Sequence, residues 1–330
     1  MSKAIAVLGA GSFGTALAFQ LARCGHDVRL WGRDAEAQVA DSKAGCNRRY
    51  LPDFPYPNNL RPVAELASAL DGADVWIMGV PSHALRSTLQ QCLPFFQSQP
   101  LVLACKGLDN GQLPTQVVAD VLGESADCAV LSGPTFAKEI AANAPTAVTM
   151  ASADVAVAER LAALFHGDRF RVYHSDDPIG VALGGALKNP LAIAAGLADG
   201  LGFGANTRAA LITRGLAEMR RLGVKLGAQS ESLMGMAGIG DLVLTCTDDQ
   251  SRNRRTGLAL ASGKGADEAI AAIGQVVEGV TAAKEIFLLA ESLGVEMPIN
   301  EQIYRLIYEN VAPLEAVQAL LGRAPRNEAE

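Results

Sequence analysis

A glycine-rich turn between a short apolar run and an amphipathic helix is the feature that most constrains this fold. Residues 5–8 are apolar and too few for a helix, so they are typical of a buried strand. Gly9, Gly11 and Gly14 follow at the spacing GxGxxG. Gly9 allows the tight turn, Gly11 lets a pyrophosphate approach the backbone, and Gly14 lets the helix pack against the strand. The stretch therefore predicts a dinucleotide site with its phosphates at the N-terminus of the helix.

Short apolar segments alternate with helical patterns through the first half of the chain. After the turn, strands are expected over residues 28–31, 75–80, 101–105, 129–131, 147–150 and 170–173. Four prolines in residues 47–62 predict an irregular excursion there. Strands that alternate with helices imply a doubly wound parallel sheet covered on both faces, which is an α/β fold of the Rossmann type.

The character of the chain changes near residue 176. The strand-like runs stop, and segments rich in Ala, Gly and Leu continue to the C-terminus. Their spacing predicts an all-helical second half that begins with separate helices over residues 178–187 and 190–196. A chain of 330 residues is long enough for two domains. We therefore expect a dinucleotide-binding Rossmann domain over residues 1–177 and an all-α substrate domain over residues 178–330.

Composition and charge exclude several classes of protein. The formal net charge is −7, so the overall field does not attract nucleic acid. Neither a signal peptide nor a run of about 18 apolar residues is evident, which predicts a cytoplasmic protein without stable membrane insertion. The four histidines form no cluster with carboxylates or cysteines, so no metal site is expected. The cysteines lack a CxxC pair or metal-ligand spacing and indicate reduced thiols; they are Cys24, Cys46, Cys92, Cys105, Cys128 and Cys246.

The end of the second expected strand bears on the choice of cofactor. A carboxylate about 20 residues past the glycines binds the ribose 2′-hydroxyl in NAD enzymes, and Asp34 is placed to do so. Arg33 is the first side chain beyond the strand, and it can instead stack on adenine and pair with a 2′-phosphate. We favour Arg33, and hence NADP, while the use of both NADP and NAD stays open.

Two lysines are candidates for chemistry, each with a simpler alternative. Lys188 is the single charge among the small and apolar residues 184–196, where desolvation would prepare it as a general base. A lysine that extends from a packed helix to the surface explains the same pattern. Lys106 follows an expected strand, at the end of a parallel sheet where ligands bind, although a lysine there is more often simply solvated. Residues 132–137 also follow a strand and form either a substrate loop or an ordinary tight loop.

Residues 248–255 are the most polar stretch of the second half. Ser251 can cap the helix that follows, which places Arg252 and Asn253 in its first turn. A helix N-terminus, a guanidinium and an amide then converge in a way that suits a phosphate. A solvated basic helix end is the alternative interpretation.

Eight short motifs follow one another along nearly the whole chain. They are GAGSFGT (9–15), VPS (80–82), KG (106–107), LSGPTFA (131–137), ALKN (186–189), GIGDLVLTC (238–246), SRNRR (251–255) and VVEG (276–279). Together and in this order they resemble the bacterial-type NAD(P)-dependent glycerol-3-phosphate dehydrogenases. The resemblance implies a two-domain enzyme whose helical domain is similar to the C-terminal domain of 6-phosphogluconate dehydrogenase. Such an enzyme interconverts dihydroxyacetone phosphate and sn-glycerol 3-phosphate, mainly for phospholipid synthesis.

The same resemblance implies roles for individual residues. Lys188 is expected to donate or accept the proton at the alcohol carbon, with Lys106 and Asp241 at the substrate's oxygens as the other catalytic residues. Further substrate contacts are expected at Gly133, Thr135, Ser251, Arg252 and Asn253, the last three at its phosphate. Expected cofactor contacts are Gly9, Gly11, Ser12, Phe13, Gly14, Arg33, Tyr50, Lys106, Ala137, Arg252, Val276 and Glu278. Phe13 stands where many relatives carry Trp, a change that preserves an aromatic surface. The expected partners are a small-molecule substrate and a second copy of the chain in a homodimer.

Two other functions would use the same architecture. One is a β-hydroxyacid or phosphogluconate-type dehydrogenase, which also uses a lysine base, and the other is a non-catalytic dinucleotide sensor. Residues 238–246 and 251–255 favour the three-carbon phosphate over the first. A sensor has no need for Lys188, Asp241 and Arg252 together. Because the expected contacts come from both domains, we also expect the domains to close on their ligands.

Overall fold

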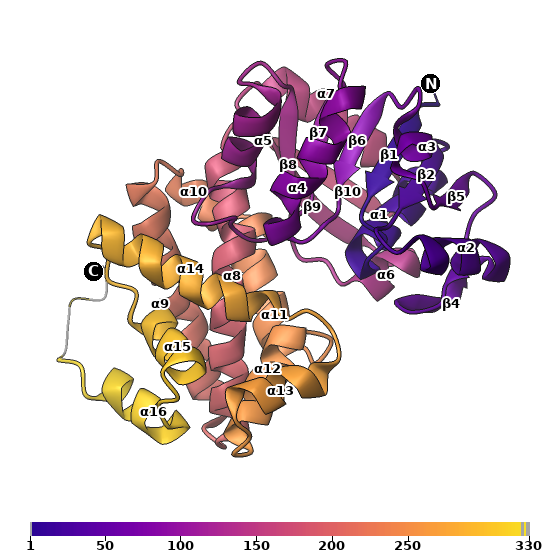
Figure 1. The fold of residues 1–330 in the computed structure, drawn as a ribbon. Coiled ribbons are helices and arrows are strands. Elements are labelled where there is room, and N and C mark those ends of the chain that lie inside the picture. Colours follow the sequence, from indigo (N-terminus) through magenta and orange to yellow (C-terminus); the bar gives the residue numbers. More distant parts are fainter. Residues whose placement is uncertain (1, 325–326, 328–330) are drawn as a thin grey trace. The chain divides into compact units, whose positions relative to one another are not determined.

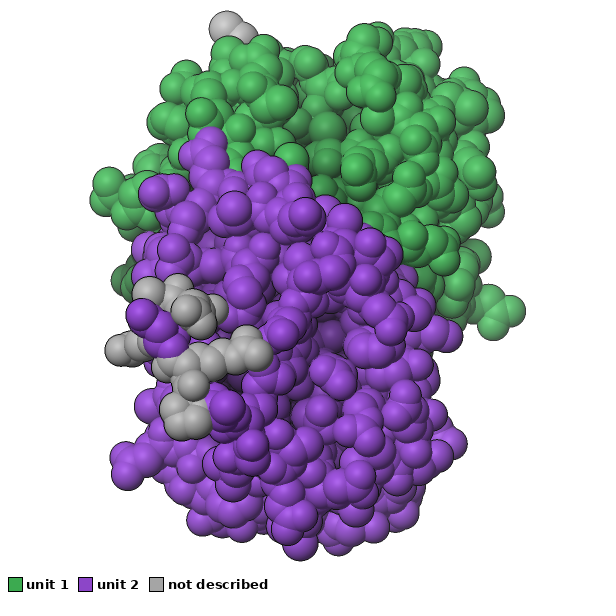
Figure 2. Space-filling model, turned by 90° about the vertical axis from the view of Figure 1, so that its left-hand side faces the viewer, with its two compact units in different colours: residues 1–182 green, residues 183–330 purple. Residues whose placement is uncertain are grey.

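The computed structural model describes residues 2–324 and 327 and divides the chain into two compact units (Figure 1). The first unit, Met1–Ala182, contains the sheet, and the second, Leu183–Glu330, is helical. Figure 2 colours them green and purple. Residues 1, 325–326 and 328–330, which include the outer ends of both expected domains, lie outside the described residues.

An eight-stranded sheet forms the centre of the first unit. The strand order reverses beside β1, because the chain extends to β2 and β5 on one side and then returns to pair β6 with β1 on the other. Open α/β sheets bind ligands at such a switch point. Across the sheet the strands are β5 (Leu60–Val63), β2 (Asp27–Trp31), β1 (Ala4–Leu8), β6 (Val75–Met78), β7 (Leu101–Leu103), β8 (Cys128–Ser132), β9 (Thr146–Ala151) and β10 (Phe170–Ser175).

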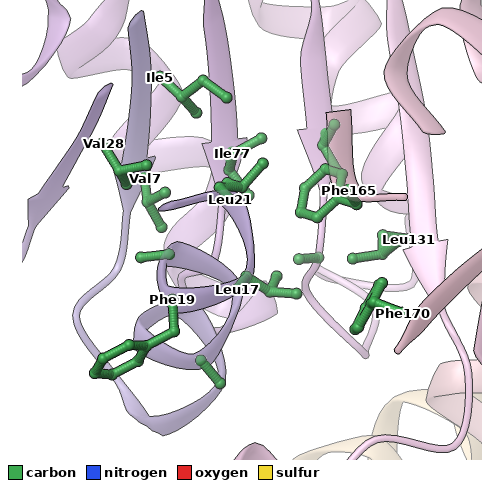
Figure 3. Close-up of a cluster of buried hydrophobic side chains, with 14 of the residues drawn as sticks. Ile5, Val7, Leu17, Phe19, Leu21, Val28, Ile77, Leu131, Phe165 and Phe170 are labelled. Atoms are coloured by element: carbon green, nitrogen blue, oxygen red, sulfur yellow. The ribbon is translucent and has the colours of Figure 1, made fainter. Parts of the chain in front are cut away.

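Both faces of the sheet are buried, which explains why its strands are continuously apolar. On one face Ile5 and Val7 pack in a cluster with Leu17 and Leu21 of α1 (Ser12–Arg23), which Figure 3 shows. Helices α6 (Ala137–Ala141) and α7 (Val155–Phe165) contribute to the same cluster. In β6, Val75 and Ile77 belong to this cluster, so Trp76 between them points to the opposite face, where it is also fully buried. On the second face α5 (Pro114–Leu122) packs on β8, and α4 (Ser82–Cys92) packs on α5.

One edge of the sheet differs from the expected all-parallel arrangement. The pairs from β5 to β8 are parallel, but β9 pairs antiparallel with β8 and parallel with β10. The connection from β8 to β9 contains only the five-residue α6, which packs on α1. Without a helix that crosses over the β8–β9 pair, the chain returns in the opposite direction. The Rossmann-type α/β class is confirmed, and the β8–β9 pair departs from the predicted parallel arrangement.

The proline-rich segment is more regular than its sequence predicts. It contains a small antiparallel pair, β3 (Cys46–Asn47) and β4 (Leu51–Pro55), and the edge strand β5. An edge strand tolerates Pro62 because proline there loses no hydrogen bond on the side away from the sheet. The remaining elements of this unit are α2 (Ala35–Ala44), α3 (Leu66–Leu70) and a 3₁₀ turn at Leu93–Phe95.

The second unit is helical, as predicted. The two helices expected around Lys188 are one helix, α8 (Pro178–Gly200), which starts in the last residues of the first unit and has Pro190 inside it. Proline removes one backbone donor, but packing on every side keeps the helix continuous. The other elements are α9 (Gly204–Lys225), α10 (Ser230–Leu233), a π-helical turn (Met236–Gly240), α11 (Asp241–Thr247), α12 (Arg252–Ala261), α13 (Ala266–Ile273), α14 (Glu278–Leu293), α15 (Pro298–Tyr308) and α16 (Pro313–Leu321).

Helix α8 is also long and apolar enough to cross a membrane, with a mean hydropathy of 1.4 over its best window. Because the helix contains Lys188, it passes on mean hydropathy although it is not an uninterrupted run of about 18 apolar residues. The whole window is buried inside the protein, which is typical of the core helix of a folded domain. Neighbouring helices approach it closely: a β-carbon on Gly257 of α12 would collide with the Ile193 carbonyl oxygen.

Candidate active site

The glycine turn after β1 lies at the switch point of the sheet, where two of its glycines are required by packing. Gly9 has a φ of +122°, and a β-carbon on it would lie 2.5 Å from the carbonyl oxygen of Gly79 at the end of β6. A β-carbon on Gly14 would collide with the Gly9 carbonyl oxygen. The turn therefore brings α1 against the carboxyl ends of β1 and β6 as closely as backbone allows.

Gly11 is different, because nothing in the described protein explains it. No described atom beyond its own neighbours lies within 4 Å of the position that its β-carbon would take. Gly11 is the N-cap of α1, whose first turn has neither a side-chain cap nor an acidic residue. The N–H groups of Ser12, Phe13 and Gly14 thus begin the helix without an acidic neighbour, and an open approach leads to them. These features fit the phosphates of a dinucleotide.

The structure gathers four of the expected site residues beside this turn. The Lys106 amine donates to the Gly133 carbonyl oxygen at 2.9 Å and to Thr135 Oγ1 at 3.0 Å. It also lies 5.2 Å from the centre of the Phe13 ring, within the range of a cation–π contact. Lys106 follows β7 and Gly133 follows β8, so neighbouring strands bring them together at one edge of the sheet.

The residues expected at the adenosine end separate into different environments. Asp34 caps α2 by accepting a hydrogen bond from the Ala37 N–H at 3.0 Å, whereas Arg33 is exposed. Tyr50, another expected cofactor contact, donates from its backbone N–H to Asn47 Oδ1 at 3.1 Å, and Asn47 in turn donates to the Ala10 carbonyl oxygen in the glycine turn.

Ala137 lies farther along the chain, as the first residue of α6, and packs against the core.

In the helical unit Lys188 is paired with a buried carboxylate. Its amine lies 2.6 Å from Asp241 Oδ1 and 2.9 Å from Thr245 Oγ1. Lys188 is 6% exposed and Asp241 0% exposed, so the simpler interpretation of a lysine that extends to the surface is wrong. The Thr245 hydroxyl also donates to the Asp241 backbone carbonyl at 2.6 Å. This arrangement fixes a buried ammonium in one position.

The local fold explains how the pair forms. The π-helical turn Met236–Gly240 leads directly into α11, whose first residue is Asp241. Asp241 and Thr245 are four residues apart in that helix and therefore share a face. Lys188 reaches both from α8.

The first turn of α12 holds three of the expected phosphate ligands. Ser251 is its N-cap and accepts a hydrogen bond from the Arg254 N–H at 3.2 Å, which confirms the predicted cap. In the described part of the chain, no carboxylate pairs with Arg252, which is partly exposed. Asn253 is buried, and its amide bonds to Asn189 and to Gly279.

The last two expected cofactor residues flank the start of α14. Val276 is 55% exposed, and Glu278 is the first residue of the helix.

Three residues that contact expected site residues are not singled out by the sequence analysis: Thr245, Asn189 and Asn47. The four-residue spacing of Thr245 from Asp241 and the position of Asn189 beside Lys188 are the signals in the sequence that could have found two of them. Asn47 lies in the proline-rich segment, and only the fold shows its contact with the glycine turn.

Three of the cysteine thiols are poorly suited to nucleophilic catalysis. Burial raises the pKa of the Cys92 and Cys246 thiols to about 12 and, with the charge of Asp127 nearby, that of Cys128 to about 11. These three are thus protonated at neutral pH and are poor nucleophiles. Among the residues that the structure describes, no group of three His, Cys, Asp or Glu residues could hold a metal ion. The buried ion pair and the glycine turn are the features that point to chemistry.

Comparison with known proteins matches both units to the same family. Family models for the N-terminus and the C-terminus of NAD-dependent glycerol-3-phosphate dehydrogenase match residues 4–158 and 177–318. A glycerol-3-phosphate dehydrogenase (NAD(P)+) of Thioalkalivibrio sulfidiphilus is 58% identical over 327 residues, which cover 98% of each chain.

Solved structures lead to the same family. The crystal structure of glycerol-3-phosphate dehydrogenase from Coxiella burnetii is 46% identical, with a TM-score of 0.94 over 98% of this chain and 99% of that one. The enzyme from Saccharomyces cerevisiae is 27% identical, with a TM-score of 0.82 over 97% of this chain and 99% of that one. With matches to both units and over nearly the whole length of its relatives, the chain belongs to the NAD-dependent glycerol-3-phosphate dehydrogenase family.

Proposed function

We propose that this chain catalyses reversible hydride transfer between NAD(P)H and dihydroxyacetone phosphate, which gives sn-glycerol 3-phosphate for glycerophospholipid synthesis. Membership of the family supports the reaction. The observation that carries the proposal in this structure is the buried Lys188–Asp241 pair, at 2.6 Å. Burying two charges costs free energy, and perturbed buried ionisable groups of this kind are concentrated at functional sites.

Lys188 is the proton donor in the reductive direction. Negative charge develops on the carbonyl oxygen as the ketone is reduced. A fixed ammonium beside that oxygen stabilises the charge and then donates a proton to the oxygen. Asp241 and Thr245 hold the amine in place, so no reorganisation is needed during the reaction. In the oxidative direction the neutral amine takes the same proton back. A bound nicotinamide supplies or accepts the hydride.

The substrate is held by residues of both units in this proposal. Arg252, with the N-terminus of α12 that Ser251 caps, binds the phosphate by charge-assisted hydrogen bonds. Asn253 contributes to the same phosphate site. Lys106, which Gly133 and Thr135 position, contacts the substrate's oxygens.

In this proposal the dinucleotide-binding domain is residues 1–177 and the substrate domain is residues 178–330. Residues of both domains contact the cofactor. Gly9, Gly11, Ser12, Phe13 and Gly14 hold the pyrophosphate, while Tyr50, Lys106, Ala137, Arg252, Val276 and Glu278 make the other contacts. Both NAD and NADP serve as cofactors. The exposed Arg33 favours NADP, because the Asp34 carboxylate is already used as a helix cap.

We place the enzyme in the cytoplasm as a homodimer that acts on a small molecule, without nucleic acid and without stable membrane insertion. The burial of α8 supports the last point.

The test is the loss of absorbance at 340 nm when dihydroxyacetone phosphate is added to the protein with NADPH or, in parallel, NADH. Oxidation that depends on the ketone supports the proposal, and the ratio of the two rates shows whether Arg33 sets the preference. Binding of NADPH without any ketone-dependent oxidation would overturn it in favour of another substrate or a sensor.

A further inference from the structure

A series of buried hydrogen bonds joins three segments of the helical unit. The Gly279 N–H donates to Asn253 Oδ1 at 2.9 Å, Asn253 Nδ2 donates to Asn189 Oδ1 at 2.8 Å, and Asn189 Nδ2 donates to the Gly185 carbonyl oxygen at 3.3 Å. A backbone N–H can only donate, so the bond from Gly279 determines the orientation of both amides. Asn189 is 2% exposed and Asn253 8%, so the series is shielded from water.

Each of these segments carries residues to which the proposed function gives a role, and the inference rests on that function. Gly279 follows Val276 and Glu278, which contact the cofactor. Asn253 lies beside Arg252, which binds the substrate phosphate, and Asn189 lies beside the catalytic Lys188. The series therefore links the cofactor segment to the substrate segment inside one unit.

The contact at Gly279 leaves no room for adjustment. A β-carbon there would lie 2.7 Å from Asn253 Oδ1 and 2.9 Å from the Asn189 carbonyl oxygen. Glycine is needed for this close approach, because any side chain would force α14 away from α12 and α8. The Asn253 amide also has both its oxygen and one N–H engaged by the protein before a substrate binds.

We infer that Asn253, in addition to its proposed contact with the substrate phosphate, couples cofactor binding to substrate binding through its hydrogen bonds to Gly279 and Asn189. When a cofactor orders Val276 and Glu278, the Gly279 N–H sets the Asn253 amide, and Asn253 sets the first turn of α12 with Arg252. The coupling is reciprocal, so sn-glycerol 3-phosphate changes the affinity for NADPH by the same factor as NADPH changes the affinity for sn-glycerol 3-phosphate.

The test measures this factor in a complex that cannot react. NADPH and sn-glycerol 3-phosphate are both reduced, so the dissociation constant of NADPH can be measured by its fluorescence with and without sn-glycerol 3-phosphate. The concentration of sn-glycerol 3-phosphate is raised until the ratio of the two dissociation constants stops changing. For the wild type we expect a ratio of about fivefold or more, as is common for coupled sites.

Two variants break the series at different bonds. Gly279→Ala inserts the colliding β-carbon, and Asn253→Asp replaces the donor to Asn189 while keeping the acceptor for Gly279. Both are expected to bring the ratio close to one. Gly265→Ala is the matched control, because its φ is −63° and its β-carbon would meet no atom within 4 Å. The control should keep the wild-type ratio.

The outcomes separate coupling from mere structure and from the function itself. A residue with only a structural role would change both dissociation constants alike and leave their ratio unchanged, which would overturn the inference. A wild-type ratio of one would overturn it too, even if the wild type oxidises NADPH with dihydroxyacetone phosphate. A wild type that shows no such oxidation would instead contradict the proposed function.

Discussion

At the scale of single residues, Lys188 has both a chemical and a structural part. Its partner Asp241 is fully buried, so the two charges stabilise each other in a place where water does not solvate them. Removing the amine takes away the cation that lies 2.6 Å from the Asp241 carboxylate as well as the proposed proton donor. A single substitution at Lys188 therefore affects turnover and stability together, and the two effects need separate measurements.

We expect Lys188→Ala to lower kcat by roughly 10² to 10⁴, the usual contribution of a general acid. It should also lower the free energy of unfolding by about 3–5 kcal/mol, because a buried charge loses its partner. The double variant Lys188→Met, Asp241→Leu should recover much of the stability but none of the turnover. Ketone-dependent oxidation of NADPH and denaturant unfolding measure the two quantities. Wild-type turnover in Lys188→Ala would remove this lysine from the mechanism.

At the scale of elements, the glycines of the β1–α1 turn have different roles, because one is needed for folding and another is left for a ligand. Gly14 is needed for α1 to pack on the turn, whereas Gly11 faces no described atom. Gly14→Ala should therefore lower both the melting temperature and the affinity for NADPH. Gly11→Ala should leave the melting temperature near that of the wild type. It should lower the affinity for NADPH, because its methyl group occupies the approach to the phosphates. Thermal unfolding and a fluorescence titration distinguish the two, and equal NADPH affinity in wild type and Gly11→Ala would contradict the placement of the pyrophosphate.

The contact between α9 and α15 predicts a dependence of stability on pH. Glu218 of α9 is 1% exposed and accepts hydrogen bonds from the Ile299 and Asn300 N–H groups in the first turn of α15, at 2.7 and 3.3 Å. Burial raises the pKa of Glu218 from 4.5 to about 7, against the opposing effect of those bonds and of the charges of Arg221 and Arg323.

Because this pKa is raised in the folded state, the protonated carboxyl contributes stability that is fully present below pH 4.5 and is lost as the pH rises through 7. Between pH 5 and pH 8 we expect the wild type to lose on the order of 3 kcal/mol relative to Glu218→Gln. The amide of the variant keeps an acceptor for Ile299 and does not titrate. Denaturant unfolding at several pH values gives the difference, and parallel curves for the two proteins would show that Glu218 does not titrate in this range.

Elements that depend on local pattern were predictable, and those that depend on packing were not. The glycine turn, the Ser251 cap and the helical second half follow from spacing and capping chemistry. The reversed direction of β9 depends on where the short α6 packs, and the continuity of α8 through Pro190 depends on its neighbours. In the site, Lys188 could be singled out as a lone charge, but its contact with Asp241 joins residues 53 positions apart.

At the scale of the whole molecule, the proposed contacts are divided between the two units. The glycine turn and Lys106 belong to Met1–Ala182, while Lys188 and the first turn of α12 belong to Leu183–Glu330. Within each unit the site residues are held by packing and short hydrogen bonds. In the proposed function, both sets of residues act on the same pair of ligands.

We expect this requirement to appear as a ligand-dependent change in dimensions. When two units hold the same ligands, the range of their relative positions narrows, so the radius of gyration from solution scattering should fall. NADPH together with sn-glycerol 3-phosphate should produce the full change without turnover, because both are reduced. NADPH with inorganic phosphate tests whether the phosphate alone suffices. An unchanged radius of gyration at saturating ligands would show that the units already hold the positions of the ternary complex before anything binds.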